Sequence, residues 1–185
     1  MKSVYVVFLL AASAFAQDRA AMQAAQSACG ATSVTFDAKI DQTQHPTPDA
    51  DADKALIYVI EDLGQCVDCY GGGSLLSVVP DVSGAVIRIG ADGSWIAAGR
   101  GGSYLFFSTN PGEHHICVNW QSTLEERSRA YAFTDLRVEA GKVYYLRARL
   151  FPGHADFSLD LESVNKDEGK FLVASSPLSL SHPKK

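Results

Sequence analysis

From Ala55 onward, apolar and polar residues alternate with a period of two, which is the pattern of half-buried β-strands. Each apolar run is rich in β-branched and aromatic residues and is bounded by residues that favour turns. Because short strands joined this closely pair antiparallel, the pattern predicts a mainly β protein, either an antiparallel β-sandwich or a partly open barrel. The runs that predict strands are 55–61, 84–89, 94–98, 103–108, 114–120, 129–138, 142–150 and 157–164, with 33–40 as a further candidate before them.

Three short connections contain the glycine that a tight hairpin needs for a positive φ angle. They are Ala91–Gly93, Asn110–Glu113 and Glu139–Lys142. We therefore expect the two strands that flank each connection to pair with each other.

Two segments outside the alternating runs predict a short N-terminal helix and a short C-terminal helix. Residues 17–28 are rich in alanine and are followed by Cys29 and Gly30, which suits a helix with glycine at its C-terminal side. Residues 167–177 begin with acidic side chains, continue as an apolar run and end at a proline. The prolines and acidic residues of 41–54 predict an exposed loop.

The first residues, MKSVYVVFLLAASAFAQ, have the features of a bacterial secretory signal peptide. Lys2 precedes an apolar run, and Ala14-Phe15-Ala16 is a small-x-small cleavage site. The apolar run is well short of the roughly 20 residues that span a bilayer, so we expect no transmembrane anchor. We predict cleavage after Ala16 and a periplasmic or secreted product. The predicted parts are a signal peptide (1–16), a helix and exposed loop (17–54) and a β-sandwich domain (55–183).

The formal charge of the chain is −5, and removal of the leader with Lys2 makes it more negative. A net acidic protein is poorly suited to nucleic acid or an anionic membrane surface as its main partner. We therefore expect neither of these partners.

Four cysteines in an exported chain favour disulfides, because the compartment is oxidising. Of the three possible pairings we favour Cys66–Cys69 together with Cys29–Cys117, which would pin the N-terminal helix to the sheet. A redox role for Cys66 and Cys69 would need a helix after the motif, and three consecutive glycines follow it instead. A zinc site would need a second ligand pair, and the chain has no other Cys-x-x-Cys. A structural disulfide is favoured over both alternatives.

The other chemistry-bearing residues predict no metal or catalytic site. In a strand, His115 shares its face with Cys117 and Asn119 but not with His114, and two such groups do not make a metal site. The alternating aspartates of 49–53 lack the glycine and the late glutamate of a calcium loop. No serine has the sequence context of a nucleophile turn, so we assign no catalytic residue and no cofactor.

The run 142–150 contains a candidate binding face. Alternation places Tyr145, Arg147 and Arg149 on one face, and the apolar residues of the other face are the core candidates. The arginine face is then expected to be exposed to solvent.

The turn at Glu139–Lys142 would bring aromatic residues of the preceding strand beside these arginines. With a three-residue loop Arg147 lies opposite Phe133, with Tyr131 nearby, whereas a two-residue loop shifts the register by one. Such a surface suits a carboxylate, a phosphate or a sugar ring. The alternative is that the arginine stems merely cover the sheet and keep it soluble.

Three segments, IRIGADGSWIAAGRGGSYLFFSTNPGEHHICVNWQ, EAGKVYYLRARLF and DEGKFLVASSPLSLSHP, resemble bacterial proteins grouped as domain of unknown function 2846. The resemblance covers about Ala55 to Pro183 and consists of a pattern of hairpins, glycine turns and aromatic positions. It implies an exported, envelope-associated β domain with no established activity, so it assigns no catalytic residue.

The sequence favours a non-catalytic binding or structural module of the bacterial cell envelope, with an envelope protein or a glycan as its partner. The alternative is an enzyme, either a thiol-redox protein that uses Cys66 and Cys69 or a hydrolase with a dispersed site.

Overall fold

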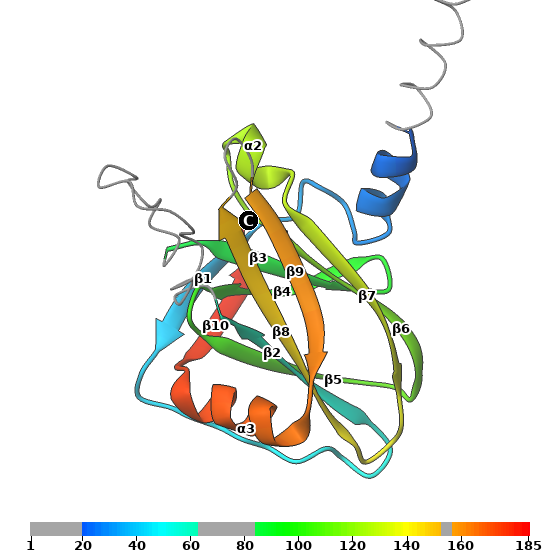
Figure 1. Cartoon of the computed structure of the whole chain (residues 1–185), viewed down its shortest axis with the longest axis vertical. Helices are drawn as coiled ribbons and strands as arrows, with labels where there is room; N and C mark the ends of the chain where they lie inside the picture. Colours follow the sequence, from blue (N-terminus) through cyan, green and yellow to red (C-terminus); the bar gives the residue numbers. More distant parts are fainter. Residues whose placement is uncertain (1–19, 63–83, 153–156) are drawn as a thin grey trace, which may run out of the picture.

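The fold is a sandwich of two β-sheets with short helices at its periphery (Figure 1). The computed structural model describes residues 20–62, 84–152 and 157–185. The larger sheet has the strand order β1 (Phe36–Asp41), β10 (Leu178–Pro183), β5 (Tyr104–Thr109), β2 (Ala55–Glu61), β8 (Val143–Pro152) and β9 (Phe157–Val164). The smaller sheet has the order β4 (Ser94–Arg100), β3 (Val86–Ala91), β6 (Gly112–Trp120) and β7 (Tyr131–Val138). The predicted β-sandwich is confirmed.

Of the three expected hairpins, one is present. Asp92 and Gly93 have φ angles of 51° and 81°, and they connect the antiparallel strands β3 and β4. The turns at 110–113 and 139–142 instead carry the chain from one sheet to the other, so the expected pairing across them is wrong. A glycine with positive φ, such as Gly141 at 70°, serves a crossing between sheets as well as it serves a hairpin.

Strand β2 occupies the middle of the larger sheet because both of its faces are apolar. It pairs antiparallel with β5 and parallel with β8, and all seven of its residues are buried. Ile57 and Val59 pack in the core between the sheets, whereas Tyr58 and Ile60 pack on the opposite side. The second parallel pair joins β10 to β5.

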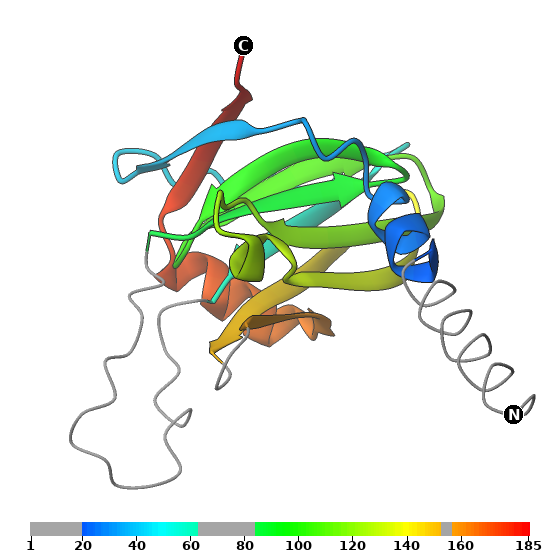
Figure 2. The same cartoon turned by 90° about the horizontal axis from the view of Figure 1, so that it is seen from above.

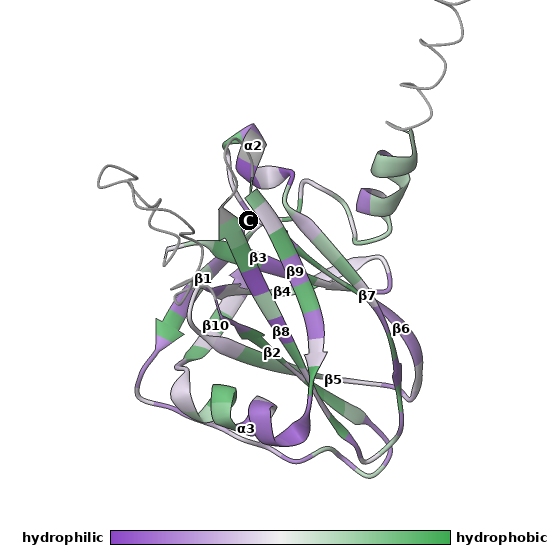
Figure 3. Cartoon of the chain, viewed as in Figure 1, coloured by the Kyte–Doolittle hydropathy of each residue, from purple (hydrophilic) through white to green (hydrophobic). Residues whose placement is uncertain are grey.

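Helix α3 (Lys166–Ser175) covers the outer face of the larger sheet and confirms the predicted C-terminal helix (Figure 2). Asn165 caps it by accepting hydrogen bonds from the amides of Asp167 and Glu168. Figure 3 shows that the first half of the helix is hydrophilic and the second half more apolar, so Val173 packs on the sheet.

Three short elements complete the described fold. Residues 20–27 form the N-terminal helix, within the predicted range. Helix α2 (Glu125–Ser128) and strand β10 were not predicted. None of the helices in the described ranges is both long and apolar enough to cross a bilayer.

Glu61, the last residue of β2, is a fully buried carboxyl group in contact with β4. A Cβ atom at Gly99 would lie 2.1 Å from its Oε1 atom, so the glycine makes room for the side chain. Burial raises the pKa of Glu61 well above its usual value of 4.5, and the backbone of Gly99 offsets this only in part. Within the described residues neither carboxyl oxygen has a hydrogen-bond partner of normal geometry.

We expect Glu61 to make the stability of the protein depend on pH. The folded state holds the proton more tightly than the unfolded state, so its contribution is complete below about pH 4.5 and is lost as the pH rises through the raised folded-state pKa. Glu61→Gln should remove this dependence and make the protein more stable than wild type at neutral pH. Urea midpoints measured from about pH 4 to about pH 8 test this, and parallel profiles for the two proteins would contradict it.

Candidate binding groove

The arginines of the predicted binding face are bound to acidic residues of the chain itself. Arg147 forms ion pairs with Glu162 of β9 and, at 2.8 Å, with Glu168 of α3. Arg149 forms ion pairs with Asp160 at 3.1 Å and with Glu162 at 3.0 Å. Although burial opposes it, the hydrogen bond and the charge of Glu162 raise the pKa of Arg147. These arginines hold β8, β9 and α3 together.

The predicted arrangement of this face is wrong in two respects. Strand β7, with Tyr131 and Phe133, pairs with β6 in the other sheet, so these rings do not lie opposite Arg147. Tyr145 is only 8% exposed because α3 covers it, and the side chain of Arg147 is only 19% exposed. The expected core face of β8 is confirmed, since it packs between the sheets; its residues are Leu146, Ala148 and Leu150.

Tyr131 and Phe133 lie on the outer face of the smaller sheet, in a row of nearly parallel rings with His115. The Tyr131 and Phe133 ring centroids are 5.9 Å apart, and the same distance separates Phe133 from His115. Asp135 lies 2.8 Å from Nδ1 of His115. His114 points to the other face, as predicted, and lies 2.6 Å from Asp92.

A disulfide between Cys29 and Cys117 joins the end of the N-terminal helix to β6, as the sequence predicted. Both cysteines are fully buried, and their Cα atoms are 5.9 Å apart. His115 lies close enough to form a three-residue cluster with them, but sulfurs joined in a disulfide are not thiolate ligands for a metal. The predicted Cys66–Cys69 pair and the leader lie outside the described residues and stay predictions.

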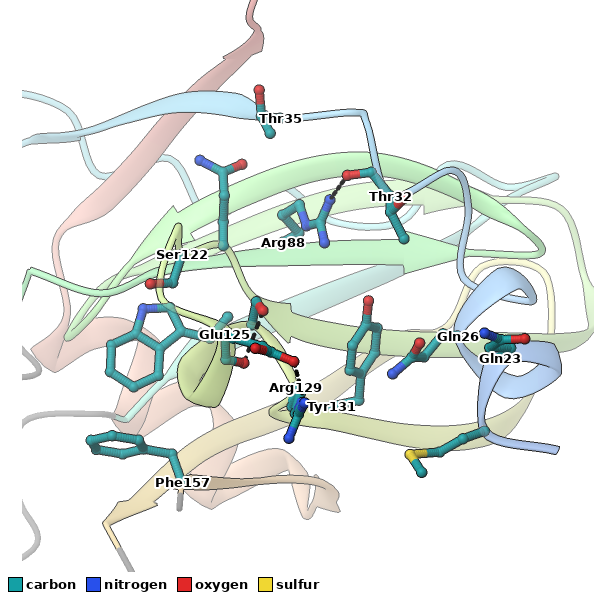
Figure 4. A pocket seen from close by; sticks show the side chains of 14 residues that line it. Gln23, Gln26, Thr32, Thr35, Arg88, Ser122, Glu125, Arg129, Tyr131 and Phe157 are labelled. Atoms are coloured by element: carbon teal, nitrogen blue, oxygen red, sulfur yellow. Dashed lines mark hydrogen bonds and ion pairs between the residues drawn. The ribbon is translucent and has the colours of Figure 1, made fainter. Parts of the chain in front are cut away.

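A groove of about 1090 Å³ lies beside this disulfide, between the N-terminal helix and α2 (Figure 4). Its volume slightly exceeds the range of about 300–1,000 Å³ that small-molecule sites use. The residues that line it come from the N-terminal helix, the segment before β1, strands β3, β6, β7 and β9, and the region of α2: Met22, Gln23, Gln26, Thr32, Thr35, Arg88, Trp120, Gln121, Ser122, Glu125, Ser128, Arg129, Tyr131 and Phe157.

Arg88 of β3 is a buried cation in the wall of this groove. It is 5% exposed; its Nε and Nη2 atoms donate to Oδ1 of Asn119, and its Nη1 donates to the carbonyl oxygens of Thr32 and Val34. The guanidinium also lies over the Trp95 ring, 4.3 Å from its centroid. All these partners are neutral, and within the described residues no carboxylate forms an ion pair with Arg88.

Tyr131 stands beside Arg88 and keeps its proton. Burial raises the pKa of its hydroxyl group, and the charge of Arg88 and a hydrogen bond with it offset the rise only in part. At neutral pH Tyr131 is therefore a neutral ring with a hydroxyl group that can donate a hydrogen bond.

The rest of the groove has both polar and apolar side chains and carries little net charge. Gln26 is half-buried and Gln23 is exposed, and neither side chain makes a hydrogen bond to another described residue. Arg129 and Glu125 form an ion pair on the rim, where both side chains are mostly exposed and the pair contributes little. At the far end Trp120 and Phe157 meet edge to face, with centroids 4.8 Å apart.

The sequence predictions missed this groove, although one signal for it was present. Arg88 is the charged residue in an otherwise apolar strand run, and a charge in that setting is rarely buried without a specific reason. Tyr131 was predicted as a binding residue, but beside the wrong arginine.

Searches of protein-family models, of curated proteins and of solved structures found no match for this chain. The resemblance to domain of unknown function 2846 stays a prediction, and the function has to be inferred from the groove.

Proposed function

We propose that the protein is a non-catalytic binding module of the bacterial cell envelope, exported to the periplasm or secreted, and that it binds its ligand in the groove between the N-terminal helix and α2. The observation that carries this proposal is Arg88, a buried cation with neutral partners in the wall of a groove of about 1090 Å³. Export is supported by the leader sequence and agrees with a disulfide in the described fold.

Binding fits the lining residues better than catalysis does. Ser122 and Ser128, the serines that line the groove, have no histidine beside them among the lining residues, and the Ser128 hydroxyl donates to the carbonyl of Glu125. His114 and His115 lie with Asp92 and Asp135 and are not part of the groove. The nearby sulfurs of Cys29 and Cys117 are joined in a disulfide.

We expect Tyr131→Ala to weaken capture of the envelope ligand by about tenfold or more, because it removes the half-buried ring of the groove. The core between the two sheets is unchanged, and the ring is also lost from the small cluster around Cys29 and Trp95, so the melting temperature of the variant is measured alongside. The measurement is quantitative capture from an envelope extract on immobilised mature protein, with proteins and released glycans both identified by mass spectrometry.

Phe171→Ala is the matched control. Phe171 is an aromatic residue 70% exposed on α3, away from the groove, so its removal should leave capture unchanged. Equal capture by wild type and Tyr131→Ala would show that the ligand binds elsewhere.

A further inference from the structure

We propose that the ligand of the groove is a saccharide that carries a carboxylate group, with the carboxylate held beside Arg88 and Tyr131. This inference rests on the proposed function and adds the chemical class of the ligand.

Arg88 combines deep burial, a place in the groove wall and the lack of a carboxylate partner among the described residues. Arg100 and Arg127 are half-buried and also form no ion pair there, but neither lines the groove. Arg147 and Arg149 are neutralised by Glu162, Glu168 and Asp160. Arg88 has only amide, carbonyl, hydroxyl and aromatic partners in the described residues, so its charge is hydrogen-bonded but not balanced. A buried charge without a counter-ion produces a positive potential at its surface, because little water screens it. An anionic group in the groove would supply the missing counter-ion.

Tyr131 can contact that anionic group directly. Its hydroxyl group is protonated and half-buried in the groove, and in Figure 4 it points toward the end where Arg88 and Thr32 lie. A hydrogen bond from a neutral donor to a carboxylate is shorter and stronger than one between neutral groups. Tyr131 therefore donates a hydrogen bond to the carboxylate. The positive charge of Arg88, which is buried beside Tyr131, stabilises the carboxylate electrostatically.

The remaining lining residues suit a saccharide. The amides of Gln23 and Gln26 both donate and accept hydrogen bonds, and the hydroxyl of Thr35 does the same, so they match the hydroxyl groups of a sugar. The ring of Tyr131 provides an apolar surface next to them.

The groove does not suit a strongly anionic ligand such as a phosphate cluster. Arg88 and Arg129 are the cationic residues that line it, and Arg129 is bound to Glu125. Ligands with several phosphates are bound by groups of arginines or by helix N-termini. The unbalanced positive charge of Arg88 therefore matches a ligand that carries a single carboxylate group.

The inference is tested by calorimetry with the mature protein and matched pairs of ligands. One pair is an oligogalacturonate and its methyl ester, and the other is an N-acetylhexosamine oligosaccharide with and without a lactyl ether carboxylate. We expect at least one acid to bind about tenfold tighter than its neutral counterpart. Tyr131→Phe should weaken binding of that acid severalfold and leave binding of the neutral form nearly unchanged, with Phe171→Ala as control.

Arg88→Gln should abolish the preference for the acid. Because Arg88 is buried, this variant could fail to fold, and the comparison of acid with neutral ligand on the wild-type protein decides the inference without it.

Equal affinity for acid and neutral ligands, or no detectable binding of either acid, overturns the inference. So does selective binding of a peptide with a free C-terminal carboxylate over its amidated form when neither acidic saccharide binds. In each of these cases the proposed function is judged separately, because it fails only if Tyr131→Ala captures as much envelope material as wild type.

Discussion

Replacing Gly169 by alanine should destabilise the protein by about 1–3 kcal/mol, although alanine favours helices by about 1 kcal/mol over glycine. Gly169 lies in the first half of α3, where the helix packs on Tyr145. An added Cβ atom would lie 2.2 Å from Cγ of the Tyr145 ring and 2.6 Å from its Cβ. These atoms are close to the β8 backbone, so they cannot move aside as the end of a long side chain could. Chemical denaturation of the two proteins measures the difference.

Two control variants separate packing from helix propensity. Lys170→Ala changes the next residue of α3, which is exposed, and Gly84→Ala adds a Cβ atom whose one close neighbour among the described residues is the Arg100 side chain at 3.5 Å. Both should stay within about 0.5 kcal/mol of wild type. A Gly169→Ala protein that is more stable than wild type would mean that α3 does not pack against Tyr145 as closely as described.

Removing the Cys29–Cys117 disulfide by replacing both cysteines with serine should lower the free energy of unfolding by about 2–4 kcal/mol. The bond closes a loop between residues 88 positions apart, so its loss frees much of the unfolded chain. It also ties the N-terminal helix to the smaller sheet. We therefore expect the sheets to persist while the amides of 20–27 exchange faster with solvent, as hydrogen exchange would measure.

The same variant should lose ligand binding in the groove, because Gln23 and Gln26 belong to the wall that the disulfide holds. Adding a thiol reductant to the double variant is the control, since any further change must come from Cys66 and Cys69. Unchanged stability and unchanged exchange at 20–27 would contradict the structural role of the bond.

Alternation predicted strands well because it depends on local burial. The limits of 55–61 and 157–164 agree with β2 and β9, and the acidic first turn and proline located α3. Strand partners were harder to predict, because the turns at 110–113 and 139–142 have the same glycine chemistry as a hairpin. Whether such a turn forms a hairpin or crosses to the other sheet depends on which strands its two flanking strands pair with. Strand β2 pairs with β5 on one edge and with β8 on the other, and this pairing is a property of the whole sheet.

The candidate site was predicted only in part for the same reason. Tyr131 and an arginine were expected together, and the structure brings Tyr131 to Arg88 instead of Arg147. Local sequence shows which residues can bind a carboxylate, but the acidic partners of Arg147 come from β9 and α3. Only the folded arrangement reveals which arginine is neutralised.

Strand β10 has a consequence for when this chain can fold. Residues 178–183 pair along their length with 36–41, so the first and last strands of the described chain lie side by side in the larger sheet. Pairing of segments so far apart in sequence makes folding slow, because a long loop must close before the contacts form. A ribosome-bound chain that has not yet released β10 leaves β1 without a neighbour in the sheet. The larger sheet can therefore be completed only after residues 178–183 are free to pair with β1.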